Sequence, residues 1–165
     1  MKNPTNVNEN RQVIRHGKYV YSSIIINATP EKVWDILMNF EQYPEWNPFI
    51  TTISGNPTIG NTIAATICPP GQKPMQFKPR VLQNLKNTEF RWIGTLGIPY
   101  LFDGEHVFQL QENNNGTTTL HHFEYFRGVL VPFFKKMLEQ NTLQGFEVMN
   151  IALKQKAESL RVAGK

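Results

Sequence analysis

Hydrophobic and polar positions alternate in residues 103–128, in two runs on either side of an Asn-rich cluster that ends in Gly116. Alternation with a period of two is typical of strands that bury one face. An Asn-Asn-Gly sequence between two such runs is typical of a hairpin loop, because glycine readily adopts the left-handed conformation. The pattern therefore predicts a long β-hairpin.

A three-residue loop over residues 114–116 fixes the register of this hairpin. It predicts the opposed pairs Leu110 with Leu120, Phe108 with His122, and His106 with Glu124. Directly opposed Cβ atoms lie about 5 Å apart, which is close enough for an imidazole–carboxyl hydrogen bond. His121 is expected on the opposite face of the hairpin.

The rest of the chain divides into further elements. Residues 1–17 are polar and aperiodic, and we predict a flexible lead-in there, followed by a single domain over residues 18–161 and a tail over 162–165. Residues 18–27 are rich in β-branched and aromatic side chains and predict the first strand. Thr29 and Pro30 are typical of a helix start, and the proline-broken residues 40–49 predict a second short helix.

Strands are expected over residues 50–54, 61–68, 76–85 and 88–95, before the hairpin. Pro79 within the third of these predicts an edge or bulged position. After Gly128, apolar residues recur at helical spacing to about Arg161, which predicts one helix about 45 Å long. Its middle is less apolar, and two explanations stay open: a solvated or bent section, or space beneath the helix at Thr142 and Gly145.

The composition narrows the possible functions. The length of 165 residues suits one domain, and the net charge of +4 comes without clustered basic and aromatic residues, so we expect no nucleic-acid partner. The single cysteine, Cys68, excludes an intramolecular disulfide. The sequence has neither an apolar run of about 20 residues nor an apolar signal segment. We therefore expect no stable membrane insertion and a cytoplasmic location.

Several segments together carry a resemblance to a known family. Residues 26–34 (INATPEKVW), 43–49 (YPEWNPF), 104–108 (GEHVF), 122–128 (HFEYFRG) and 145–150 (GFEVMN) resemble the START/Bet v 1-like (SRPBCC) superfamily. Within it, the polyketide cyclase/dehydrase and lipid-transport group is the most similar. The resemblance spans residues 18–160 and is more specific for fold than for activity.

The resemblance implies an α+β helix-grip fold. In this fold a curved antiparallel β-sheet wraps around a long C-terminal α-helix, with two short helices after the first strand and a cavity between sheet and helix. Members bind lipids, sterols, hormones or polyketides, some catalyse cyclisation or dehydration, and others are co-chaperone-like modules. The superfamily has no common catalytic motif that can be carried over.

Candidate site residues follow from the predicted faces. His106 and Glu124 are the candidate catalytic pair, since a buried imidazole beside a carboxyl group can transfer protons, although a purely structural pair is the alternative. The candidate ligand-binding residues are apolar or hairpin side chains that would face the cavity: Trp46, Phe49, Trp92, His106, Phe108, His122, Glu124, Phe126, Phe146 and Met149. We expect no metal, because the histidines lack a helical ligand motif such as H-E-x-x-H.

Three hypotheses of function follow. The first is binding of a small hydrophobic ligand of lipid, polyketide or aromatic type, by a monomer or homodimer. The second is a cofactor-independent cyclase, dehydratase or hydrolase that uses His106 and Glu124. The third is a co-chaperone-like protein-interaction module. We expect no cofactor in any of these cases.

Overall fold

A computed structural model describes residues 19–159, so the predictions for residues 1–17, 160–161 and 162–165 lie outside the described part. The elements follow one another along the chain as β1 (Tyr19–Ile26), α1 (Pro30–Met38), the 3₁₀ turn η1 (Phe40–Gln42), α2 (Tyr43–Trp46), β2 (Ile50–Ser54), β3 (Ala64–Ile67), β4 (Met75–Phe77), β5 (Arg80–Leu85), β6 (Glu89–Thr95), β7 (Asp103–Glu112), β8 (Thr118–Arg127), α3 (Val131–Met137), the π-helical turn η2 (Leu138–Thr142) and α4 (Leu143–Ser159).

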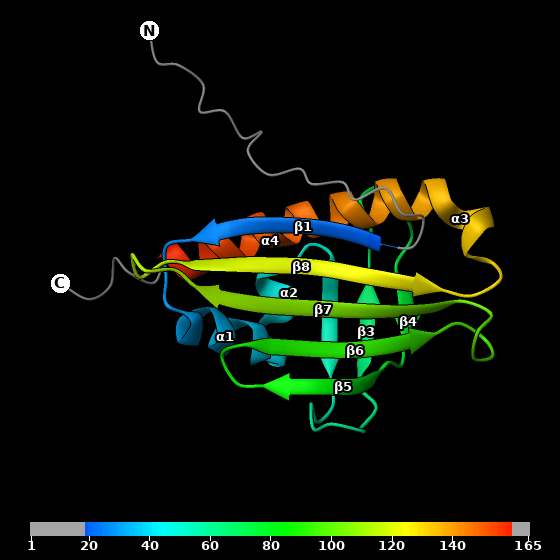
Figure 1. The fold of residues 1–165 in the computed structure, drawn as a ribbon, viewed down its shortest axis with the longest axis horizontal. Coiled ribbons are helices and arrows are strands. Elements are labelled where there is room, and N and C mark those ends of the chain that lie inside the picture. The colour runs from blue at the N-terminus through cyan, green and yellow to red at the C-terminus, as the bar shows by residue number, and fades with distance from the viewer. Residues whose placement is uncertain (1–18, 160–165) are drawn as a thin grey trace, which may run out of the picture.

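The strands form two antiparallel sheets. The larger has the order β1-β8-β7-β6-β5, and the smaller has the order β2-β3-β4. Figure 1 shows α4 passing behind β1 and β8, while the smaller sheet runs crosswise behind the lower strands of the larger one. This arrangement confirms the predicted helix-grip fold, with the C-terminal helix held against one face of a curved sheet.

The predicted hairpin register is confirmed. Strands β7 and β8 pair His106 with Glu124 and Phe108 with His122, and Gly116 has a φ of 75°. The inner face of the sheet carries Phe108, His106 and His122, which are buried, and it packs against Phe146 of α4. The short loop with Gly116 therefore fixes the register of the hairpin, and the register determines which side chains face the core.

The predicted strand over residues 76–85 is wrong as one element. It divides at Pro79 into β4, an edge strand of the smaller sheet, and β5, an edge strand of the larger. Proline has no N–H to donate to a ladder, and here its carbonyl accepts from the Ile63 backbone N–H at 2.9 Å. Pro79 therefore marks the corner where the chain passes from one sheet to the other.

The first helix begins as predicted. Thr29 Oγ1 accepts a 3.4 Å hydrogen bond from the Lys32 backbone N–H, and Pro30 occupies the first turn, where no N–H is needed.

No helix among residues 19–159 is long and apolar enough to cross a bilayer.

The predicted single long helix is interrupted by a π-helical turn, η2. The question left open at Gly145 is answered by Phe49, whose ring lies against the Gly145 backbone so closely that a side-chain carbon at 145 would overlap it. The Phe49 ring also makes an edge contact with Phe146, at 5.8 Å between centroids. Glycine at this position therefore lets an aromatic ring reach the helix backbone, and the space beneath the helix is filled by that ring.

Candidate functional site

A pocket of about 710 Å³ lies between the inner face of the larger sheet, the smaller sheet, and the segment formed by α3 and η2. Most of its lining is apolar and much of it is aromatic. The lining residues are Phe49, Ala65, Ile67, Pro69, Gly71, Gln72, Lys73, Met75, Phe77, Pro79, Trp92, Gly94, Leu96, Phe102, Gly104, Glu124, Phe126, Phe134, Leu138, Asn141 and Thr142.

The π-helical turn contributes directly to the pocket, because Leu138, Asn141 and Thr142 all come from η2. Such turns insert one residue into a helix and occur often at functional sites. The turn therefore presents an amide and a hydroxyl to a space that is otherwise mostly apolar.

Charge enters the lining at two positions, Lys73 from the connection between β3 and β4, and Glu124 from β8. Glu124 lies on the inner face of the sheet, where 15% of its side chain is exposed. Its Oε1 atom occupies the space over Gly104 that any side chain at 104 would fill. Gly104 therefore makes room for the carboxyl group at the pocket wall.

His106 lies behind Glu124, in the core. It is 1% exposed and stacks on Trp92, with 4.7 Å between ring centroids and an angle of 8° between the planes. Its Nδ1 atom is 3.5 Å from Oε2 of Glu124. This distance is longer than an ordinary hydrogen bond, and Nδ1 has no hydrogen-bond partner among the described residues.

A chain of hydrogen bonds continues from His106 into the core. His106 Nε2 is 2.8 Å from His122 Nε2, and His122 Nδ1 is 2.9 Å from Asn150 Oδ1 on α4. The amide nitrogen of Asn150 donates to Ser22 Oγ on β1 at 3.2 Å. His122 also stacks on Phe146, with 3.7 Å between centroids. Polar groups from β7, β8, α4 and β1 are thus joined across the interior.

Burial controls the charge of these groups. Loss of water lowers the pKa of His106 to about 3 and raises the pKa of Glu124 to about 8. The pKa of His122 is lowered well below its ordinary value, mainly by burial and further by the neighbouring His106 ring. Both shifts at the pair favour the neutral forms, so at neutral pH His106 and Glu124 are an uncharged pair rather than an ion pair.

The predicted site residues fall into two groups. Phe49, Trp92, Glu124 and Phe126 line the pocket. The other six do not line it and lie in or beside the core: Trp46, His106, Phe108, His122, Phe146 and Met149. The structure therefore brings His106 and Glu124 together as the register predicted, with Glu124 as the member of the pair that reaches the pocket.

Three residues of this polar system were missed in the sequence. Asn150 lies at helical spacing from Phe146, Met149 and Leu153, and Ser22 lies on the same face of β1 as Val20 and Ile24. A polar residue at a core-facing position of an apolar pattern is the signal that would have identified both. Gly104 gave no such signal, because the space it provides depends on the neighbouring strand.

Within residues 19–159, no group of three or more His, Cys, Asp or Glu side chains is arranged to hold a metal ion.

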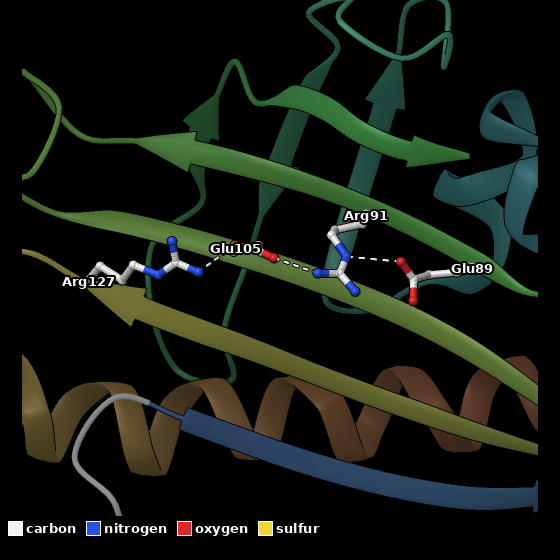
Figure 2. A network of polar contacts seen from close by, with 4 residues as sticks. All are labelled: Glu89, Arg91, Glu105 and Arg127. Carbon is white, nitrogen blue, oxygen red and sulfur yellow. Dashed lines mark hydrogen bonds and ion pairs between the residues drawn. The ribbon is translucent and has the colours of Figure 1, made fainter. Parts of the chain in front are cut away.

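A second polar cluster lies on the outer face of the larger sheet. Figure 2 shows its side chains following one another across β6, β7 and β8. Glu105 accepts one hydrogen bond from Arg91 and one from Arg127, each at 2.8 Å, and Arg91 also contacts Glu89 at 3.0 Å. These residues face away from the pocket and hold neighbouring strands together.

The curved sheet, the gripped helix and the lined pocket define a helix-grip α+β domain. The sequence model of the family described as "Polyketide cyclase / dehydrase and lipid transport" matches residues 19–158, and the chain belongs to this family. A comparison with curated proteins gave no match.

Solved structures with the same fold include a START superfamily protein from Mycobacterium smegmatis. It is 21% identical, with a TM-score of 0.69 over 87% of this chain and 99% of that chain. A protein from Thermus thermophilus is 13% identical, with a TM-score of 0.67 over 86% and 98%. Ara h 8.0201 is 17% identical, with a TM-score of 0.63 over 86% and 97%. At these identities the likeness shows the fold alone.

Proposed function

We propose that the protein binds a small hydrophobic molecule of lipid, polyketide or aromatic type in the pocket between the two sheets and the segment formed by α3 and η2. The observation that carries this proposal is the pocket itself, about 710 Å³ in volume and lined mostly by apolar and aromatic side chains. Pockets for small organic ligands have roughly 300–1,000 Å³ and are lined mainly by such residues with a few polar groups.

The lining also suits this ligand class in detail. Trp92 and Phe126 contribute aromatic rings from the sheet, and Phe134 contributes one from α3. The polar groups are few and separate, so they would fix the orientation of a ligand, while the apolar side chains supply most of the contact surface. We further propose that the domain works as a monomer or homodimer in a reducing compartment such as the cytoplasm, in keeping with a single cysteine, Cys68.

Ligand binding can be tested with the fluorescent apolar probe N-phenyl-1-naphthylamine. We expect saturable enhancement of its emission by the wild-type protein. A Gly94→Phe substitution should abolish it, because a side chain at 94 projects into the pocket and meets only Pro79, at 4.0 Å. Ile93→Phe is the matched control, since it adds the same ring one residue away, on the outer face.

Retention of saturable probe binding by a folded Gly94→Phe protein would contradict the proposed site. Native mass spectrometry of the freshly expressed wild-type protein complements this test, because a co-purifying molecule would reveal the ligand class directly. The Gly94→Phe protein should carry less of any such molecule.

A second candidate function is acid–base catalysis without a cofactor, and the position of Glu124 favours it. Its carboxyl group lines the pocket and has a pKa of about 8, near the pH at which a general acid or base works best. His106 does not line the pocket, so it would position Glu124 rather than touch a substrate. Incubation of a co-purified ligand with wild-type and Glu124→Gln protein tests this: a product formed by the wild type alone supports catalysis, and an unchanged ligand contradicts it.

A further inference from the structure

We infer that the pocket selects apolar ligands that carry a hydroxyl group, which donates a hydrogen bond to Oε1 of a neutral Glu124 carboxyl group. This inference rests on the proposed ligand-binding function and names the ligand chemistry of the same pocket. It follows from the direction of the hydrogen bonds between Glu124 and Ser22.

The direction is set at Asn150. Its amide nitrogen donates to Ser22 Oγ, so its Oδ1 faces His122 Nδ1 and can only accept. His122 Nδ1 must therefore carry a proton, and in a neutral ring this leaves Nε2 as an acceptor.

The same reasoning passes to the next ring. His106 Nε2 is 2.8 Å from the bare His122 Nε2, so His106 must donate from Nε2. Burial lowers the pKa of His106 to about 3, so the ring is neutral and its Nδ1 has a lone pair and no proton. This nitrogen is 3.5 Å from Oε2 of Glu124.

A lone pair in this position requires a donor. Nδ1 is buried and has no hydrogen-bond partner among the described residues, which is costly for a polar atom. A protonated Glu124 supplies the donor from Oε2 after a shift of roughly half an ångström, whereas a carboxylate would set negative charge against the lone pair. Burial of Glu124, which raises its pKa to about 8, acts in the same direction.

The proton on Oε2 determines what Glu124 offers to a ligand. With Oε2 donating to His106, Oε1 remains a pure acceptor, located over Gly104 at the pocket wall. Within residues 19–159, the polar contact of Glu124 is the 3.5 Å approach of its Oε2 to His106 Nδ1, which leaves Oε1 for a ligand. Lys73 is the other charged group of the described lining, and it comes from the connection between β3 and β4. An acceptor without a donor in an apolar wall favours a ligand hydroxyl.

Three probes of similar shape test this inference by calorimetry at pH 6. These are 2-naphthol, which donates; 2-methylnaphthalene, which neither donates nor accepts; and 2-methoxynaphthalene, which only accepts. We expect the wild-type protein to bind 2-naphthol about tenfold more tightly than either of the others, the value of one hydrogen bond in a dry site.

Variants at Glu124 separate the effect of its carboxyl group on ligand preference from the effect of the apolar pocket. Glu124→Leu should remove the preference for 2-naphthol. Glu124→Gln should restore it relative to Leu, because the Gln amide can donate to His106 Nδ1 and still present an oxygen to the ligand. Glu112→Leu, at an exposed position of β7, is the control for loss of a glutamate elsewhere in the hairpin.

Equal binding of all three probes by the wild type would overturn the inference and leave the proposed function standing. A preference for 2-naphthol that persists in a folded Glu124→Leu protein would also overturn it. Failure of all three probes to bind the wild type would contradict ligand binding at this pocket, and the inference with it.

Discussion

The Nε2 atoms of His106 and His122 lie 2.8 Å apart, so one imidazole donates a hydrogen bond to the other. Both rings are almost completely buried, and each is stacked on an aromatic ring that fixes its orientation. Two charged imidazoles at this distance would repel each other and lose their hydrogen bond. The geometry therefore excludes two charged rings, and burial, which lowers the pKa of both histidines, favours two neutral rings in complementary tautomers.

Stability should fall between about pH 6.5 and pH 8 because of Glu124. Burial raises its pKa from 4.5 to about 8, so over this range the folded state holds a proton that the unfolded state has lost. The free energy of unfolding then decreases as pH rises, by at most about 1.4 kcal/mol per pH unit for one proton. The pKa values of His106 and His122 are lowered from 6.5, so they reduce stability only below that value, as pH falls.

Denaturant unfolding of wild-type and Glu124→Gln protein at several pH values measures this effect. We expect the wild type to lose stability from pH 6.5 to pH 8, and the Gln variant to show a flatter profile, because its amide does not titrate. Parallel profiles for the two proteins would show that Glu124 has an ordinary pKa in the folded state.

The tautomers can be read directly by NMR. We expect the ¹⁵N shifts of the folded protein to show the Nε2–H form of His106 and the Nδ1–H form of His122, with neither ring titrating between pH 5 and pH 8. Asn150→Leu removes the acceptor for His122 Nδ1 and should change the tautomer balance of both histidines. Protonation of either ring near pH 6 in the wild type would contradict the directed chain.

On the outer face, Glu105 should matter more than its neighbour Glu89. Glu105 is 7% exposed and accepts from two arginines, whereas Glu89 contacts Arg91 alone at the end of the cluster. Glu105→Gln keeps the shape but removes the charge and places an amide N–H against a guanidinium. We expect a loss of about 2 kcal/mol in the free energy of unfolding, and less than half of that for Glu89→Gln.

Arg127 provides an internal comparison in the same cluster. Its side chain is 60% exposed against 31% for Arg91, so water screens its contact with Glu105 more strongly. Arg91→Met should therefore cost more stability than Arg127→Met. The reverse order in thermal or denaturant unfolding would show that burial does not decide the strength of these contacts.

Local chemistry explains what could be predicted from the sequence. The pairing of His106 with Glu124 followed from a short loop and from Gly116, because hairpin register depends on a few adjacent residues. The division at Pro79 was not predictable, since residues 76–85 are strand-like on both sides and only the partner strands decide which sheet each half joins. The proline was recognised as an irregularity, but its role as a corner depends on long-range pairing.

The candidate site shows the same limit. The sequence identified the inner face of the hairpin, but not which of its residues the last helix would cover. Phe146 and Asn150 of α4 lie over His122, and this contact puts His122 in the core, away from the pocket. Because the pocket is displaced toward the π-helical turn and the smaller sheet, its lining depends on elements far apart in the chain.

The close approach of Phe49 to Gly145 gives a prediction whose sign depends on the partner residue. Alanine is favoured over glycine inside a helix by about 1 kcal/mol, so Gly145→Ala would stabilise α4 if nothing else changed. In this protein the added carbon overlaps the buried Phe49 ring, which is 2% exposed. Such overpacking costs about 1–3 kcal/mol, so we expect Gly145→Ala to be destabilising overall.

Removing the ring should reverse that sign. In a Phe49→Ala background, Gly145→Ala meets no aromatic ring, and the helix preference alone should make it neutral or stabilising by up to about 1 kcal/mol. Denaturant unfolding of the wild type, the two single variants and the double variant gives the interaction energy directly. Additive effects of the two substitutions would contradict a direct contact between Phe49 and the helix backbone. Since Phe49 also lines the pocket, Gly145→Ala should in addition weaken binding of the N-phenyl-1-naphthylamine probe, because the displaced ring has the pocket as its free space.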